Sequence, residues 1–330
     1  MTMVRKIIVI GVLIILACVM FIPAFGADSG NIVTALEGPE DRGSYLEPSY
    51  SDYLAEHGFS GVMAASEIKV DLQSYRTSED MQAYIQDGAV VTGESGTITW
   101  DVMVREAGFY QIQITYVPVR GTTSKIERKL YIDDTSYFKG MNQLIFHRKW
   151  DNSGGQQVAM MNGNEVRPVA VELPEPMTVY IMDAQRRNLE PYRFYLSAGR
   201  HTLTLESVKE PMEIRDITLK SAPEIKPYAE VIEEWKALYP VYDGDNLVYQ
   251  AERIDDLTLS IMKSSIDIVM NTDYSNPYTV PYHPYKIRLN TIGGTNWRTP
   301  GDYIEWKIHV PQEGLYRISF RAVQNTNRGV

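Results

Sequence analysis

Two short polar segments in the middle of the chain contain the residue types that recognise polar ligands. "FHRKWDNSGGQQ" carries Arg148, Trp150 and Asn152, and "NGNEVRP" carries Asn164 and Arg167. An aromatic ring can stack on the apolar C–H face of a pyranose while amide and guanidinium groups bind its hydroxyls. The sequence therefore predicts a saccharide site in this region, with Trp150 as the aromatic platform.

Tyrosines in the same long region, residues 135–192, offer further ring faces. Tyr192 is added to the predicted ligand-binding residues, and Tyr180 is a second candidate of the same kind. The alternative is that a long loop region of this type packs on its own domain or on a neighbouring one. Both interpretations stay open at the level of the sequence.

Catalysis finds little support in the residue pattern. The histidines are scattered, and there is no H-E-x-x-H, no G-x-S-x-G and no phosphate-binding glycine loop. Glu165 and Asp183 could be imagined as a carboxylate pair for glycoside hydrolysis, but nothing in the sequence selects them over the other acids. We expect no enzymatic activity from this chain.

Composition describes a globular and acidic chain. Its 330 residues are 44% hydrophobic and 22% charged, a length that suggests about two domains. The formal net charge of −10 disfavours nucleic acid as a partner, because phosphate backbones are bound mainly through clustered lysines and arginines.

The N-terminus has the pattern of an export signal. Arg5 and Lys6 precede an apolar run over residues 7–22, and Ala24 and Gly26 are the small residues of a cleavage site. We expect residues 1–26 to be a signal peptide cleaved after Gly26, which places the protein outside the cell or at the cell surface.

Two alternatives remain for this N-terminal segment: an uncleaved membrane anchor, and a lipoprotein signal that uses Cys18. Cys18 is the single cysteine of the chain, so cleavage after Gly26 would leave no thiol and no disulfide.

Further along the chain, the pattern predicts the order of the elements. Residues 27–58 read as a polar leader with a short helix, "SYSDYLAEHG", capped by Ser49 or Ser51 and ended by Gly58. Residues 59–222 alternate with period two in runs such as "TITWDVMV" and "FYQIQITYV", which predicts an all-β antiparallel sandwich. Residues 223–243 predict a linker helix, expected to pack on one module through an apolar face of Val231, Trp235 and Leu238.

One segment of the sandwich occurs twice. "ITWDVMVREAGFYQIQITY" at residues 98–116 matches "IEWKIHVPQEGLYRISFRA" at residues 304–322 without gaps, so that Trp100 aligns with Trp306 and Gly108 with Gly314. We expect the tryptophans to pack in a core with the indole N–H bonded to a backbone carbonyl, and the glycines to supply a positive φ in hairpin turns.

The second copy, residues 244–330, contains only the first half of the unit. The fold predicted is therefore two copies of a sandwich, the second truncated, joined by the helix. Because half a sandwich leaves an open edge, we expect the sequence to be the N-terminal piece of a longer protein.

The opening "YQAE" of residues 249–252 and the ending "GRHTLTLESVKEPMEIRDITL" resemble those of carbohydrate-binding modules with a galactose-binding-like, jelly-roll fold. With "KIRLNTIGGTNWRTPGDYIEWKIHVPQEGLYRI", the chain is similar to the N-terminal tandem modules of large bacterial extracellular solute-binding proteins of ABC-type sugar transporters. The resemblance implies an oligosaccharide or polysaccharide as ligand, and an ABC transporter permease as a partner reached through a missing C-terminal domain.

The same resemblance implies a structural calcium ion, held by the glutamate of the opening motif and an aspartate of the last strand. The matching residues are Glu67 and Asp216 in the first copy and Glu252 in the second. Two carboxylates with backbone carbonyls can supply the oxygen ligands that calcium requires. The first copy departs from the motif at Ala65 and Ser66, so Glu67 has the alternative role of a solvated surface carboxylate.

Three functions follow from the sequence as alternatives. The first is a secreted, non-catalytic carbohydrate-binding region of a solute-binding protein for sugar uptake. The second is a structural or docking spacer without sugar affinity, and the third is the accessory region of a secreted glycoside-degrading enzyme.

Overall fold

The computed structural model describes residues 47–58, 63–152, 158–221, 226–254 and 259–322. The proposed signal peptide and Cys18 lie outside these residues. Within them the chain is mostly β-strand, with antiparallel sheets and two α-helices, so the predicted all-β sandwich is confirmed. No helix in the described ranges is both long and apolar enough to cross a membrane.

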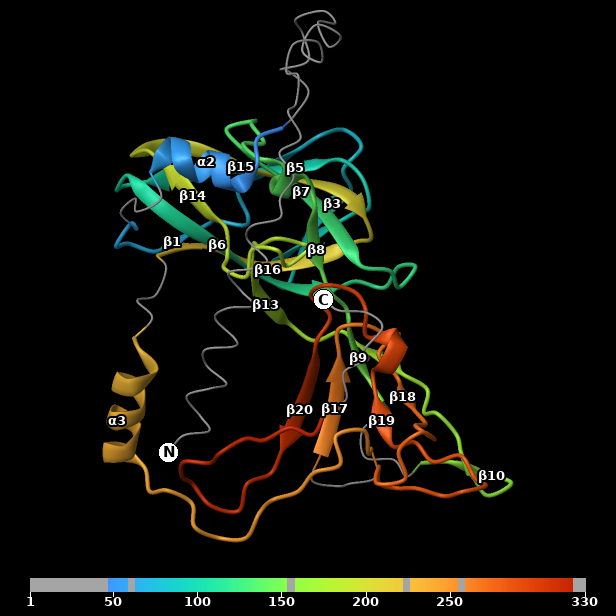
Figure 1. The fold of residues 1–330 in the computed structure, drawn as a ribbon. Coiled ribbons are helices and arrows are strands. Elements are labelled where there is room, and N and C mark those ends of the chain that lie inside the picture. The colour runs from blue at the N-terminus through green and yellow to red at the C-terminus, as the bar shows by residue number, and fades with distance from the viewer. Residues whose placement is uncertain (1–46, 59–62, 153–157, 222–225, 255–258, 323–330) are drawn as a thin grey trace, which may run out of the picture. The chain divides into compact units, whose positions relative to one another are not determined.

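Two sheets form the sandwich of the first copy, and Figure 1 draws them as facing layers. The first sheet has the order β13-β6-β16-β4-β3, with β1 also on β16 and β14 also on β6. Its strands are β1 Ile68–Lys69, β3 Ala83–Gln86, β4 Ala89–Thr92, β6 Gly108–Pro118, β13 Met177–Tyr180, β14 Arg193–Leu196 and β16 Met212–Lys220. The second sheet has the order β2-β5-β15-β7-β8. Its strands are β2 Tyr75–Thr77, β5 Thr97–Val104, β7 Ile126–Ile132, β8 Leu144–Phe146 and β15 Gly199–Lys209.

Alternating burial along the strands places the core between these sheets. β7 alternates strictly between buried and half-buried residues, and in β5 residues Ile98, Trp100, Val102 and Val104 are buried. Side chains of successive strand residues point to opposite faces, so period two in the sequence becomes one apolar face per sheet. The buried faces enclose one continuous apolar cluster.

Helix α2, Tyr50–His57, covers an edge of the sandwich. Ser49 caps it in a reciprocal capping box with Asp52, and Gly58 ends it with φ of 83°, as the sequence predicted. The hydroxyl of Tyr50 accepts the backbone N–H of Arg193 at 2.8 Å. The Tyr53 hydroxyl accepts that of Tyr195 at 2.7 Å, so the helix satisfies edge N–H groups of β14.

A third sheet combines segments from both predicted modules. Its order is β12-β9-β17-β20, with β9 Lys149–Asp151, β12 Val171–Leu173, β17 Leu259–Lys263 and β20 Ile304–Ile308. β9 pairs with β17 so that Asp151 lies opposite Met262 and Trp150 opposite Lys263. A second, small apolar core that includes Ile261 and Leu289 lies among these segments. Backbone pairing therefore crosses the boundary that the sequence predicts between the modules.

Short elements complete the described chain. Two hydrogen-bonded pairs are β10 Met160–Met161 with β11 Asn164–Glu165, and β18 Met270–Asn271 with β19 Thr291–Ile292. Two 3₁₀-helices are η2 Lys139–Asn142 and η3 Gly294–Asn296.

Helix α3, Tyr228–Leu238, differs from the expectation that it packs on a module. None of its residues is buried, and Trp235 and Leu238 on its apolar face are 49% and 71% exposed. Contact with the second copy comes after the helix, where the N–H of Leu315 donates to the Pro240 carbonyl and the N–H of Tyr242 donates to the Leu315 carbonyl.

The repeated tryptophans have the predicted structural role in both copies. Trp100 is fully buried and donates its indole N–H to the carbonyl of Leu72 at 3.2 Å. Trp306 packs against the small core and donates to the carbonyl of Ala251 at 2.8 Å. Each indole therefore fastens a repeated strand to the segment that opens its copy.

The repeated tyrosines and the backbone next to them also correspond. Tyr110 donates to the carbonyl of Glu106, and Tyr316 donates to that of Gln312, four residues earlier in each case. Isolated parallel bridges join Met63 to Phe109 and Val241 to Leu315. The repeat thus specifies the same local structure twice.

The expectation of a positive φ at the repeated glycines was wrong. Gly108 and Gly314 do not have positive φ values. At Gly314 the reason for glycine is space, because a Cβ atom there would lie 2.9 Å from the Pro240 carbonyl oxygen.

Residues 309–322 also form no counterpart of β6, and Ile318 and Phe320 are 74% and 77% exposed. β6 is a central strand held by β13, β14 and β16. The described part of the second copy provides no equivalent of these partner strands.

Candidate functional site

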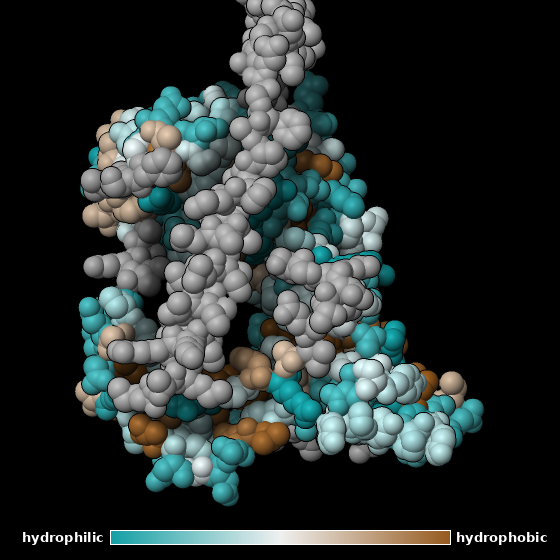
Figure 2. Space-filling model, in the orientation of Figure 1, coloured by the Kyte–Doolittle hydropathy of each residue, from teal (hydrophilic) through white to brown (hydrophobic). Residues whose placement is uncertain are grey.

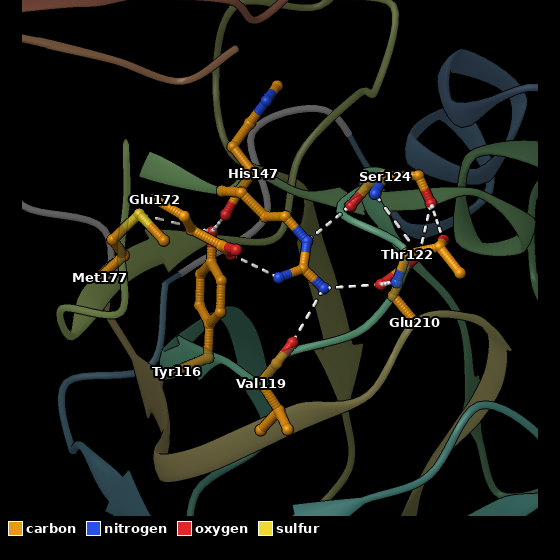
Figure 3. A network of polar contacts seen from close by, with 9 residues as sticks. Tyr116, Val119, Thr122, Ser124, His147, Glu172, Met177 and Glu210 are labelled. Carbon is orange, nitrogen blue, oxygen red and sulfur yellow. Dashed lines mark hydrogen bonds and ion pairs between the residues drawn. The ribbon is translucent and has the colours of Figure 1, made fainter. Parts of the chain in front are cut away.

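Arg148, one of the predicted ligand-binding residues, is the centre of a buried polar network, whose partners Val119, Ser124, Glu172 and Glu210 are labelled in Figure 3. Its side chain is 2% exposed. The guanidinium donates to the carboxylates of Glu172 and Glu210 at 2.5 and 2.7 Å, and to the carbonyls of Val119 and Ser124 at 3.0 and 2.7 Å. Arg148 therefore holds the loop of residues 119–124 against the sandwich and does not face a ligand, contrary to the expectation.

Glu210 provides the matching anion in this network. Its carboxylate accepts the hydroxyl of Ser124 at 2.6 Å, and both the hydroxyl and the backbone N–H of Thr122. Burial acts to raise the pKa of Glu210, but these hydrogen bonds and the charge of Arg148 outweigh it and lower the pKa to about 2. The carboxylate stays ionised at neutral pH and serves the fold.

Trp150 and Asn152 are also buried, which corrects their predicted role. Trp150 is 7% exposed on β9, between β12 and β17, so its ring has no open face for a pyranose. Asn152 is 2% exposed and its side-chain oxygen accepts a hydrogen bond from Lys263. Burial lowers the pKa of Lys263 to about 8.

Tyr192 is a core residue as well. It is 3% exposed, with its ring centroid 4.6 Å from that of Tyr50 and 4.8 Å from that of Phe138. Burial raises its pKa. The ring helps to fix helix α2 on the sandwich and is closed to ligands.

Asn164 and Arg167 lie in a different place, on and just after the hairpin of β10 and β11. The side-chain oxygen of Asn164 accepts the backbone N–H of Ile287 at 3.0 Å. The Glu165 carboxylate accepts the N–H of Leu289 at 2.7 Å and binds the guanidinium of Arg253 at 3.1 Å. These bonds fix the hairpin on the segment of residues 286–289.

A cavity of about 380 Å³ opens beside this hairpin. Its apolar lining comes from Ile287 and Leu289, and its polar lining from Glu165, Arg167, Asn271 and Thr272, with the ring of Tyr274. Small-molecule sites typically have volumes of about 300–1,000 Å³ and combine apolar walls with few polar groups. The structure thus brings Arg167 into a candidate site, and Asn164 holds the lining residue Ile287 through its backbone N–H. The other predicted ligand-binding residues are buried elsewhere: Arg148, Trp150, Asn152 and Tyr192.

Arg167 is held by one hydrogen bond, from its Nη2 atom to the side-chain oxygen of Asn271 at 2.7 Å. Asn271 is itself fixed, because its Nδ2 atom donates to the carbonyls of Val269 and Gly293. The guanidinium is thereby oriented while its other N–H groups bind no acceptor among the described residues.

Tyr274 belongs to a loop that sequence reasoning overlooked. The loop exposes Tyr274 by 59% and Tyr278 by 78%. Asn290, which is 4% exposed, fastens both ends: it accepts the N–H of Asp273 at 2.7 Å and donates to the carbonyls of Asp273 and Pro281. In Figure 2 the surface around β10, at the lower right, is mostly pale, the colour of intermediate hydropathy.

The signal for this site was present in the sequence. "DYSNPYTVPYHPY", residues 273–285, places four tyrosines in a segment interrupted by three prolines. Proline at this density excludes a helix or a central strand, so the tyrosines had to lie on a loop, where aromatic rings are more often exposed.

Two of the three residues matched to a calcium site, Asp216 and Glu67, already have cationic partners. Asp216 pairs with Lys69 at 2.8 Å and accepts the Thr218 hydroxyl at 2.6 Å, and Glu67 pairs with Lys220 at 3.4 Å. An ammonium group therefore already lies at each carboxylate. Across the described ranges no group of three or more His, Cys, Asp or Glu side chains is placed to hold a metal ion.

Glu252 and Glu67 differ in their position relative to the repeated tryptophan. Glu252 directly follows Ala251, whose carbonyl accepts the Trp306 indole N–H, whereas Glu67 precedes Leu72, whose carbonyl accepts the Trp100 indole N–H, with residues 68–71 between them. Glu252 is 5% exposed.

The two carboxylates considered for hydrolysis have structural partners. Glu165 binds Arg253 and the N–H of Leu289, as described above. Asp183 accepts the backbone N–H groups of Gln185, Arg187 and Asn188, which shapes its own loop.

Comparisons with known proteins relate this chain to solved structures at low similarity. A family 35 carbohydrate-binding module from Clostridium thermocellum has 12% sequence identity and a TM-score of 0.31, covering 48% of this chain and 100% of the module. A family 35 module from an environmental isolate has 18% identity and a TM-score of 0.27, covering 49% and 99%. An exo-β-1,3-galactanase from Phanerochaete chrysosporium has 10% identity and a TM-score of 0.28, covering 48% and 30%. No protein-family model and no curated protein matches the chain.

Proposed function

We propose that this chain is a carbohydrate-binding region and that the cavity beside Tyr274 is its saccharide site. The observation that carries the proposal is a cavity whose lining combines the exposed Tyr274, two apolar side chains and an oriented arginine–asparagine pair. A pyranose has an apolar C–H face and polar hydroxyl edges, and this lining is complementary to both.

The way the site is built favours binding. Asn290 fixes both ends of the loop that carries Tyr274, and Asn271 fixes the guanidinium of Arg167. Groups that are ordered before the ligand arrives lose less conformational entropy on binding. The site is therefore preorganised, as suits a ligand such as a sugar that binds with weak to moderate affinity.

We further propose the setting that the sequence resemblance implies. The chain would be a secreted, non-catalytic region of an extracellular solute-binding protein for ABC-type sugar uptake, with the transporter permease as a partner. The export pattern of residues 1–26 supports this setting, as does the acidic charge, which disfavours nucleic acid.

The experiment is calorimetric titration of the full chain with a panel of oligosaccharides, repeated with Tyr274→Ala. Loss of the ring is expected to weaken binding about tenfold, which corresponds to about 1.4 kcal/mol. Tyr84→Ala is the matched control, because Tyr84 is 55% exposed on strand β3 of the first sheet. Absence of binding to every sugar by the folded chain would favour the structural or docking spacer instead.

A further inference from the structure

We propose that the saccharide bound at this cavity carries an anionic group, a carboxylate or a sulfate, and that Arg167 binds it. This inference rests on the proposed function and names the ligand class of the same site. It follows from the charges around the cavity and from the geometry of one guanidinium.

Arg167 is available for an anion in a way that Arg148 is not. Arg148 is buried and its guanidinium meets two carboxylates of the chain. Arg167 is exposed, and its one acceptor among the described residues is the neutral amide of Asn271. A planar guanidinium whose N–H groups are unused can bind a carboxylate or sulfate through two parallel hydrogen bonds.

The one carboxylate in the cavity lining does not cancel this charge. Both oxygens of Glu165 lie 3.1 Å from a nitrogen of Arg253, so that pair is neutral overall. Asp273, adjacent to the lining residues Thr272 and Tyr274, is capped by the N–H and hydroxyl of Ser275 at 2.7 and 2.6 Å. Asp273 is the one acidic residue of this loop, and its negative charge opposes that of the nearby cations.

Two more cations flank the lining residue Ile287. Lys286 donates to the carbonyl of Asn162, and Arg288 donates to that of Gly163. Carbonyls satisfy the hydrogen bonds of these side chains without neutralising them, and among the described residues neither forms an ion pair. Arg167, Lys286 and Arg288 therefore give a local positive excess over Asp273 on a chain whose net charge is −10.

This excess has a physical consequence for ligand choice. An anionic sugar would be attracted by all three cations, whereas a neutral sugar gains only its stacking and hydroxyl contacts. Attraction between exposed charges is screened over about 10 Å at 0.1 M salt, so the preference depends on salt concentration.

The test compares oligosaccharides that differ only in the anionic group, titrated into the full chain. One pair is an oligogalacturonate and its methyl ester, and a second is a sulfated galactan oligosaccharide and its desulfated form. We expect the anionic member of at least one pair to bind about tenfold more tightly at low salt, with the preference decreasing as salt is added. The pair that shows the larger preference identifies carboxylate or sulfate as the recognised group.

Variants assign the preference to Arg167. Arg167→Met should remove most of the preference for the anionic sugar and leave only the part that Lys286 and Arg288 supply. Arg167→Lys should retain more of the preference, because it keeps the charge but loses the planar fork. Arg105→Met, at an exposed position after β5, makes the same change in net charge away from the cavity. Thermal unfolding of each variant confirms that it is folded.

The outcomes separate this inference from the proposed function. Equal affinity for both members of each pair, with binding that still depends on Tyr274, overturns the inference and leaves the saccharide site in place. Equal weakening of both members by Arg167→Met also overturns it, because Arg167 would then serve only to hold the hairpin through Asn271. Failure of every sugar to bind overturns the proposed function and the inference together.

Discussion

Trp150 of β9 lies directly opposite Lys263 of β17 in an antiparallel pair. Both side chains are buried, Trp150 with 7% exposure and Lys263 with none. The pair joins the long polar region of the first copy to a strand of the second. Residues predicted as a ligand platform therefore belong to a sheet that both copies build.

The first prediction concerns Trp150→Ala. Truncating a buried tryptophan removes apolar contacts and leaves a cavity, so we expect the free energy of unfolding to fall by about 3–5 kcal/mol. Urea unfolding of the full chain measures this change. Trp297→Ala is the control, because Trp297 is 47% exposed and its truncation should change stability far less. Lost sugar binding with unchanged stability would instead support the platform that the sequence predicted.

The second prediction concerns Glu210→Gln. The variant removes the anion from a buried network and leaves the charge of Arg148 with Glu172 as its remaining carboxylate partner. Breaking a buried ion pair from one side typically costs about 3 kcal/mol or more. We expect a loss of this order in urea unfolding at pH 7, and little change for the exposed Glu94→Gln.

The stability that Glu210→Gln loses depends on pH, and the pKa of Glu210 gives the direction of this dependence. The pKa of Glu210 is lowered in the folded state to about 2, from 4.5 for the unperturbed group. The stabilisation from the ionised carboxylate is therefore complete above the unfolded pKa and disappears as the pH falls through the folded one. The difference in stability between Glu210→Gln and the wild type should be constant near neutral pH and shrink between about pH 4.5 and 2. A difference that stays constant across this range would contradict the assignment.

Local sequence patterns predicted the features that depend only on residues close together in the sequence. The cap of α2 at Ser49 and the packing of Trp100 follow from short sequence windows, and both are observed. Trp150 was misassigned because its burial depends on β17, more than a hundred residues later in the chain. No local pattern in "RKWDN" reports that pairing.

The candidate site shows the same limit. Arg167 could be named from its type and its polar surroundings, but the cavity also needs Asn271 and Tyr274, which the second copy supplies. The tyrosines could have been found from the proline-rich segment that carries them. The attachment of their loop by Asn290 could not have been found in this way. Asn290 lies outside the loop and binds both of its ends with one buried side-chain amide.

The third prediction concerns the attachment of α2 through Tyr53. Tyr53→Phe removes the oxygen that accepts the backbone N–H of Tyr195, and an unpaired N–H costs about 1–3 kcal/mol if water cannot replace the partner. We expect faster hydrogen exchange at the Tyr195 amide, and unchanged exchange at Ile114 in the centre of the sheet. Tyr137→Phe is the control, since the described residues provide no hydrogen bond for that hydroxyl. Equal effects of the two variants would show that ring packing alone holds the helix.

The fourth prediction concerns calcium. Lys69 and Lys220 neutralise Asp216 and Glu67, so a calcium ion would have to displace two ammonium groups to reach these carboxylates. A bound ion raises stability by RT ln(1 + [L]/Kd), and so weak binding leaves no measurable shift. We expect the thermal midpoint of the full chain to be the same in millimolar calcium and in chelator. Asp216→Asn is the control, because it weakens any calcium site at this position. A rise in the midpoint with calcium that disappears in Asp216→Asn would show that the ion displaces Lys69 and would restore the site that the resemblance implies.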